Sequence, residues 1–292
     1  MNTRFVVAPA LYLALAAGIA SADLKPIFGG NIEPLDANAR FVMPVTAPYY
    51  NENSFITTDV RGWFVYHKFN SDALPDSHAT DLAAQIRIAL TDRLQLVAYK
   101  DGYLDLNGAV KDSGWNDLAA GLKWQWYRDD KSQFFAAVGA GYEFRTGESK
   151  VLQNDSEARF WASLDKGFGK FHTGLNINYR ATTSGKNKDN GNSDIFSWHL
   201  HADYRLTDWF SPVVEFNGYH VVNDSDSGIA LNGADVLNLG AKDADPTVTA
   251  AIGTEFRAGE NTALRAAYEI PLSSNKSDLF GTRFTFSIIY TF

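Results

Sequence analysis

The chain ends in Phe280-Gly-Thr-Arg-Phe-Thr-Phe-Ser-Ile-Ile-Tyr-Thr-Phe292, a stretch in which aromatic and polar residues alternate with a period of two. Successive side chains of a strand point to opposite faces, so this period predicts a strand and not a helix. One face carries Phe284, Phe286, Ile288, Tyr290 and Phe292, and the other carries Arg283, Thr285, Ser287, Ile289 and Thr291. In a soluble sandwich such a strand would be an aggregation hazard unless its edge were paired. In a membrane barrel, one face of the strand contacts lipid and the other faces a polar lumen.

The rest of the chain repeats this kind of strand. We predict strands over residues 55–68, 80–90, 94–101, 116–128, 132–145, 156–166, 170–181, 194–206, 210–222, 246–257, 262–271 and 280–292. Tight turns near 91–93, 129–131, 167–169, 207–208 and 259–261 alternate with longer links over 69–79, 102–115, 146–155, 182–193, 223–245 and 272–279. Outer-membrane barrels sort their connections in this way, into short periplasmic turns and long extracellular loops. The predicted fold class is therefore all-β, an antiparallel transmembrane β-barrel of about twelve strands.

The N-terminal region differs in composition from the barrel. Residues 1–22 combine Arg4, an apolar run and a final Ala20-Ser21-Ala22, which predicts a signal peptide. A transmembrane helix is the weaker interpretation, because Pro9 interrupts a run that is already short for a span. Residues 23–54 lack clean periodicity and carry Pro26, Pro34, Pro44 and Pro48, which predicts irregular structure. This segment is expected either to lie in the periplasm or to fold into the barrel mouth as a plug, ahead of a barrel over 55–292.

The composition fits strands that are apolar on one side. Hydrophobic residues make up 45% and aromatic residues 14% of the 292, yet the mean hydropathy is −0.22. The chain has no cysteine, which excludes disulfides, thiol nucleophiles and cysteine-ligated metals. Its net charge of −8 argues against nucleic acid as a partner.

Charged residues of both signs, together with histidines, fall on the faces that we predict to line the lumen. In lipid, each charge would cost roughly 2–4 kcal/mol near the bilayer midplane, so these residues should face inward. The predicted lumen-lining residues are Arg61, Arg87, Lys123, Glu143, Arg145, Glu157, Arg159, Arg180, His199, His201, Asp203, Arg205, Glu215, Glu255, Arg265, Glu269 and Arg283, together with Asp59, Asp165 and Arg257. Two interpretations stay open: a charge-lined pore that filters solutes, and a salt-bridge network that closes a narrow barrel.

Histidines are the candidates for site chemistry. His172, His199 and His201 share the lumen face of neighbouring strands and could ligate a metal, but ordinary polar filling is the favoured interpretation, because the sequence places no carboxylate ligand beside them. His220 is the histidine most open to an outward position, as a lipid hydrolase would need, and no serine partner can be placed at its height. We therefore expect no catalytic residue, no metal and no cofactor.

Two stretches carry a family resemblance. Asn116-Asp-Leu-Ala-Ala-Gly-Leu-Lys-Trp124 and Gly141-Tyr-Glu-Phe-Arg-Thr-Gly147 resemble bacterial outer-membrane transporters of the MetA-pathway-of-phenol-degradation type. The resemblance implies a bacterial outer-membrane location and passive passage of small molecules, including hydrophobic or aromatic compounds. The strand ending at Phe292 resembles the C-terminal signal that the barrel-assembly machinery recognises.

These features predict an outer-membrane channel or transporter that is not an enzyme. Its expected partners are the lipid bilayer, the barrel-assembly machinery and a small-molecule solute. A structural or adhesive barrel with working loops is the first alternative, and an outer-membrane lipid hydrolase is the second.

Overall fold

A computed structural model of the chain describes residues 25–31, 41–183, 193–226, 230, 232–233, 235–238, 240–273 and 278–292. The predicted signal peptide, residues 1–22, lies outside the described residues. Across the described part of the chain, no helix has the length and apolar character needed to cross a membrane. The irregular segment predicted over 23–54 is described at 25–31 and from residue 41 onward.

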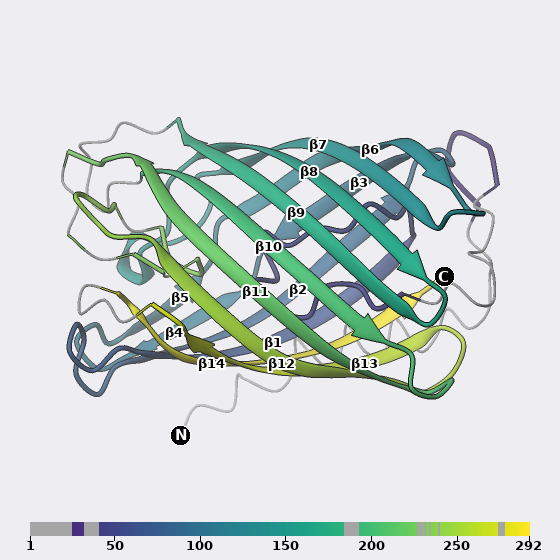
Figure 1. The fold of residues 1–292 in the computed structure, drawn as a ribbon. Helices are drawn as coiled ribbons and strands as arrows, with labels where there is room; N and C mark the ends of the chain where they lie inside the picture. The colour runs from purple at the N-terminus through teal and green to yellow at the C-terminus, as the bar shows by residue number, and fades with distance from the viewer. Residues whose placement is uncertain are drawn as a thin grey trace, which may run out of the picture.

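The described residues form a single antiparallel sheet that closes on itself (Figure 1). Its strands are β1 (Asp59–Phe69), β2 (His78–Ala89), β3 (Leu94–Lys100), β4 (Tyr103–Asn107), β5 (Asp112–Trp115), β6 (Leu118–Asp129), β7 (Phe134–Phe144), β8 (Glu157–Phe168), β9 (Phe171–Thr182), β10 (Asp194–Tyr204), β11 (Phe210–Asn223), β12 (Thr247–Arg257), β13 (Thr262–Pro271) and β14 (Phe280–Thr291). A short 3₁₀ helix, η1, spans Ser149–Val151. Strand β1 pairs with both β2 and β14, and this pairing closes the barrel.

The barrel has the twelve strands that the sequence predicts. Strand β2 pairs with β3 along one half and with β4 along the other, so β3 and β4 form one interrupted barrel strand. Strands β5 and β6 form a second one in the same way, since β4 pairs with β5 and β3 pairs with β6. The prediction of a twelve-stranded antiparallel barrel is therefore confirmed.

The prediction of a link over 102–115 is wrong in one respect, because β4 and β5 cover most of this range. The break between β3 and β4 is a local distortion. The Asp101 carboxylate accepts a hydrogen bond from the Ala84 amide (2.8 Å), and the Gly102 carbonyl accepts one from the Asn116 amide (2.9 Å). Gly102 has a φ of +127°, and a Cβ there would lie 2.8 Å from Asp81 Oδ1. The strand is therefore only kinked at Asp101-Gly102 and continues beyond it.

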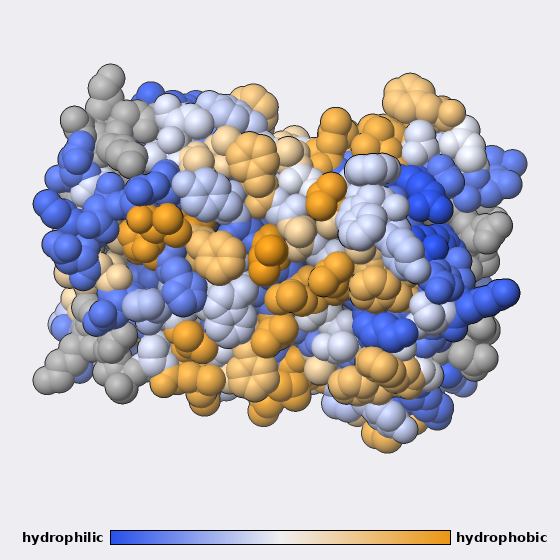
Figure 2. Space-filling model, turned by 45° about the horizontal axis from the view of Figure 1, so that its top comes forward, coloured by the Kyte–Doolittle hydropathy of each residue, from blue (hydrophilic) through white to orange (hydrophobic). Residues whose placement is uncertain are grey.

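The barrel exterior is apolar across the middle and polar at both ends. Figure 2 shows this band on one face, with hydrophilic residues gathered at the two ends. Outward side chains of the band are exposed, among them Leu82, Ile86, Leu122, Phe160, Leu164, Ile177, Leu200, Val214, Phe216, Ile252, Phe284 and Phe286. Exposed Trp124, Trp126 and Trp209 lie near the short turns, where an aromatic girdle of a membrane barrel is expected.

The inward faces carry the polar residues, as the alternation predicts. On β14, the side chains of Arg283, Thr285 and Ser287 are buried, whereas those of Phe284 and Phe286 are exposed. The first strand begins at Asp59, four residues later than predicted, because Phe55 and Ile56 are buried inside the barrel and do not pair with β14.

Gly139 of β7 makes room for a tryptophan inside the barrel. It lies opposite Trp161 of β8, and a Cβ at Gly139 would overlap the indole ring. Gly139→Ala should therefore destabilise the barrel by about 1–3 kcal/mol, the usual cost of overpacking. Urea titration of refolded protein, followed by heat-dependent gel migration, measures the shift. Ala140→Val on the exposed face of the same strand is the matched control. An unchanged midpoint for Gly139→Ala would contradict this packing.

Candidate functional site

The lumen contains residues 41–58, the inner segment, which precedes β1 (Figure 1). The Val42 amide donates to Asp203, near the short-turn end of β10 (3.3 Å). Farther along, the carbonyls of Tyr49 and Tyr50 accept hydrogen bonds from Arg159, near the loop end of β8 (2.8 and 2.6 Å). The chain then returns to the short-turn end, where β1 starts at Asp59. The inner segment is thus a re-entrant loop that rises from the short-turn end and comes back to it.

Glu52 is the main charged anchor of the inner segment. Its carboxylate forms ion pairs with Arg87 of β2 and with Lys123 of β6, the latter at 3.5 Å, and all three side chains are buried. The Glu52 carbonyl accepts a hydrogen bond from Ser163 of β8 (2.6 Å). Burial alone raises the pKa of the Glu52 carboxyl, but Arg87, Lys123 and Arg61 lower it to about 2. Glu52 is therefore ionised at neutral pH and ties the inner segment to wall strands β2, β6 and β8.

Arg159 holds the apex of the inner segment. Besides the two carbonyls, its guanidinium donates to Asn178 Oδ1 (2.6 and 2.8 Å). Its central carbon lies over the rings of Tyr99 and Trp161, 4.7 and 4.6 Å from their centroids. A planar donor that bonds two carbonyls and stacks on aromatic rings is a role that lysine cannot reproduce.

A second insertion enters from the opposite end. We call residues 235–238, part of the long link between β11 and β12, the outer segment. Asp235 accepts two hydrogen bonds from Arg283 of β14, one of them 3.1 Å long, and a third from the Tyr219 hydroxyl (3.0 Å). Glu269 lies 3.8 Å from the same guanidinium. Burial alone raises the pKa of the Asp235 carboxyl, but Arg283 holds it below its usual value.

Asn238 fixes the other side of the outer segment. Its side-chain amide donates to Glu143 (2.7 Å) and to Asp117 (2.9 Å), and its oxygen accepts from Lys100 (3.0 Å). Lys100 also forms an ion pair with Glu143 (2.6 Å). Because these side chains are buried, the outer segment is held by fully desolvated polar contacts.

The two insertions meet inside the barrel. Tyr49 and Tyr50 of the inner segment share one buried apolar cluster with Val236 and Leu237 of the outer segment. Wall residues from β2 and β4 complete this cluster, among them Leu104. The two insertions therefore contact each other inside the barrel at the height of the tyrosine pair.

A row of alternating carboxylates and histidines lines the lumen near the short-turn end. His172 lies between Asp165 (3.0 Å) and Asp203 (2.6 Å), and His201 lies between Asp203 (3.0 Å) and Glu215 (2.6 Å). All five side chains are buried. The row thus alternates three carboxylates with two imidazoles, and both nitrogens of each imidazole lie within hydrogen-bond distance of a carboxylate.

The same carboxylates hold the inner segment. Glu215 accepts the amides of Val45 and Thr46 (2.8 and 2.7 Å), and Asp165 accepts the amide and the hydroxyl of Ser54 (2.6 and 2.5 Å). With Val42 bound to Asp203, each carboxylate of the row has a partner in the inner segment. Backbone amides that would otherwise be buried without a partner are satisfied in this way.

Most of the residues predicted to line the lumen are buried within the barrel. They are Arg61, Arg87, Lys123, Glu143, Glu157, Arg159, Arg180, His199, His201, Asp203, Glu215, Glu255, Arg265, Glu269 and Arg283. Arg145, Arg205 and, at the end of β12, Arg257 are not buried. Arg145 is exposed beyond the end of β7, where its guanidinium donates to the Asn154 carbonyl (3.0 Å), and Arg205 is half-buried just beyond the end of β10. The alternation that predicts an inward side chain stops where the strand stops.

The lumen charges form ion pairs of two kinds. Some pairs lie within the wall, such as Arg265 with Glu255 (2.8 Å). Others join the wall to an insertion, as Glu52 and Asp235 do. The sequence analysis did not identify Glu52, Asp235, Asn238, Tyr49 or Tyr50. In the sequence, these residues are recognisable only as charged, polar or aromatic residues within stretches that otherwise look like solvated loop.

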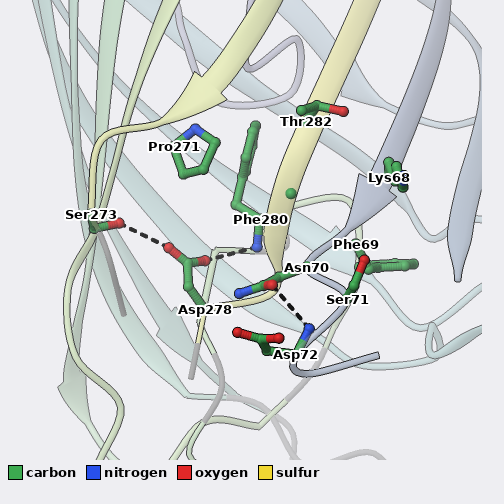
Figure 3. A pocket seen from close by; sticks show the side chains of 11 residues that line it. Lys68, Phe69, Asn70, Ser71, Asp72, Pro271, Ser273, Asp278, Phe280 and Thr282 are labelled. Atoms are coloured by element: carbon green, nitrogen blue, oxygen red, sulfur yellow. Dashed lines mark hydrogen bonds between the residues drawn. The ribbon is translucent and has the colours of Figure 1, made fainter. Parts of the chain in front are cut away.

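A pocket of about 360 Å³ lies at the loop end between β1 and β14 (Figure 3). Lys68, Asp72 and Asp278 contribute its charged groups, and Asp278 is fixed by the Ser273 hydroxyl (2.9 Å) and the Phe280 amide (2.8 Å). Phe280 lines the pocket, and its ring lies 4.7 Å from the Arg283 guanidinium. The pocket therefore adjoins the ion pair that holds the outer segment.

His220 of β11 is half-buried. Its Nε2 accepts a hydrogen bond from the Trp198 indole (3.0 Å), and no serine of the described chain bonds to it.

The fold is similar to those of solved outer-membrane proteins. The COG4313 outer membrane channel from Pseudomonas putida F1 matches with a TM-score of 0.62 at 14% identity, over 86% of this chain and 100% of that one. The NanC porin matches with a TM-score of 0.50 at 12% identity, over 80% and 98%. No family model matches the chain, and no curated protein matches it either.

The closed barrel with its apolar band is an outer-membrane β-barrel, and its location is the bacterial outer membrane, as predicted. At these identities, the likeness to the two solved structures concerns the fold.

Proposed function

We propose that this barrel is a passive channel for small molecules, closed in the described state by the inner and outer segments. The observation that carries the proposal is that both insertions are held to the lumen wall by polar and charged contacts, including Glu52 with Arg87 and Asp235 with Arg283. Such contacts can be exchanged for water when a segment leaves, whereas a continuous apolar core cannot. The lumen-facing charges would then line the open path.

Aromatic residues around Arg159 support a class of solute. Tyr50, Tyr99 and Trp161 surround the Arg159 guanidinium, with ring centroids 4.6–5.4 Å from its central carbon. Stacking surfaces of this kind suit planar, weakly polar molecules. Together with the resemblance to MetA-pathway transporters, they favour small aromatic compounds as cargo. Liposome uptake of benzoate against a sugar of similar size compares the two classes, and equal rates would contradict this preference.

A crosslink tests whether the inner segment closes the channel. Asn217 of β11 donates to the Thr46 hydroxyl (3.0 Å), and the chain has no cysteine of its own. A Thr46→Cys, Asn217→Cys protein joined by a short thiol-specific crosslinker should show no conductance in planar bilayers. The same preparation without the crosslinker should show openings, because the segment can leave the lumen.

Deletion of residues 41–57 distinguishes the channel function from closure of the channel by the inner segment. The deletion should give steady conductance if the barrel is a channel closed by the inner segment. A folded deletion protein that neither conducts nor admits solutes would exclude the channel function itself. Equal conductance with and without the crosslink would retain the channel but reject the inner segment as its closure.

A further inference from the structure

We propose that His172, His201 and Asp203 form a Zn²⁺ site in the lumen wall. Their candidate ligand atoms all lie within 4.8 Å of one another, and the three side chains are buried. Tetrahedral zinc with ligands at 2.0–2.1 Å needs ligand atoms about 3.3 Å apart, so small side-chain movements around the shared Asp203 oxygen would form the site. Two imidazoles and one carboxylate are a donor set that zinc prefers, with a fourth position left for water.

Pairing across two strands places these ligands together. Asp203 of β10 lies opposite His172 of β9, and His201 lies opposite Gly174. A Cβ on Gly174 would lie 2.9 Å from Asp165 Oδ1, so the glycine makes room for the carboxylate that supports His172.

The surrounding carboxylates have the positions of supporting groups. The other ring nitrogens, Nε2 of His172 and Nδ1 of His201, contact Asp165 and Glu215 (3.0 and 2.6 Å). Metal-ligating histidines generally donate their second N–H to a carboxylate, which fixes the tautomer and the ring orientation. Each histidine here has such a carboxylate on the side away from Asp203.

One carboxylate oxygen of Asp203 is available to bind the ion. Its Oδ2 accepts from both histidines and from the Val42 amide (3.3 Å), whereas its buried Oδ1 has no hydrogen-bond partner. The carboxylate can thus ligate through one oxygen and keep the Val42 amide on the other. The Phe41 ring stacks on His172, with centroids 4.3 Å apart.

Zinc binding to the full chain in detergent micelles tests the site. After chelator treatment, equilibrium dialysis against Zn²⁺ near neutral pH should give one ion per chain. His172→Gln, His201→Gln and Asp203→Asn should each weaken binding at least tenfold. The matched control is His199→Gln: this histidine is buried on the same face of β10, but its ring contacts Asn217 (2.7 Å) and Ser197 (3.2 Å) and no carboxylate. Heat-dependent gel migration checks that each variant is folded.

X-ray absorption of the zinc-loaded wild type provides a test that needs no variant, and it should show two imidazole ligands. The proposal is overturned by any of three results: no stoichiometric binding by the wild type, fewer than two imidazole ligands, or equal affinities of the His201→Gln and His199→Gln proteins.

Discussion

Glu52→Ala should turn an intermittently open channel into one that conducts most of the time. The substitution leaves Arg87 and Lys123 buried without the carboxylate that both contact. Removing one partner of a buried ion pair costs about 3–5 kcal/mol, which shifts the docking equilibrium of the inner segment by a factor of roughly 100 to several thousand. The open fraction in single-channel recordings measures this shift directly.

Glu255→Ala is the control for this experiment. It also removes a buried carboxylate from two cationic side chains, but its partners, Arg257 and Arg265, belong to the wall (2.9 and 2.8 Å). It should lower the stability of the barrel without raising the open fraction. If both variants conduct alike, or if Glu52→Ala stays as closed as the wild type, Glu52 does not hold the closed state.

Arg283→Met should release the outer segment. It leaves Asp235 and Glu269 buried without their shared cation, at a similar cost of about 3–5 kcal/mol. In a Val236→Cys background, the thiol should be protected when Arg283 is present and should react with an aqueous maleimide when it is replaced. The chain contains no other cysteine to confuse the labelling.

Arg265→Met provides the comparison, because Arg265 is a buried arginine paired with Glu255 and not with the outer segment. Val236→Cys should remain protected in that protein. Labelling at the same rate in both backgrounds would show that loss of any buried arginine loosens the barrel, and that Arg283 has no particular role in holding residues 235–238.

The barrel could be predicted from the sequence because its signal is local. Alternation on β14 and β10, and the sorting of short and long links, need no knowledge of tertiary contacts. Predictions failed where a tertiary contact decides the backbone. Residues 102–115 are predicted as a link, but the strand continues beyond a kink that β2 stabilises, and Phe55 and Ile56 look like strand but lie inside the lumen.

The inward residues of the barrel wall could be predicted from the sequence, but the residues of the inserted segments that contact them could not. Inward positions of Arg87, Arg159 and Glu215 follow from parity alone. The partners of Glu52 do not, because they depend on how far an irregular chain rises in the lumen. The row around His172 and His201 depends on the stagger between β9 and β10, which sets Asp203 opposite His172 and which no single strand encodes.

The apolar cluster shared by Tyr49, Tyr50, Val236 and Leu237 has a consequence for signals that reach the protein from either compartment. If one insertion withdraws, the other loses buried nonpolar area and becomes easier to displace. Thermodynamic linkage makes this influence mutual, so a periplasmic stimulus and an extracellular ligand would act cooperatively although they never touch. Breaking the tyrosine contact should make the two responses independent of each other.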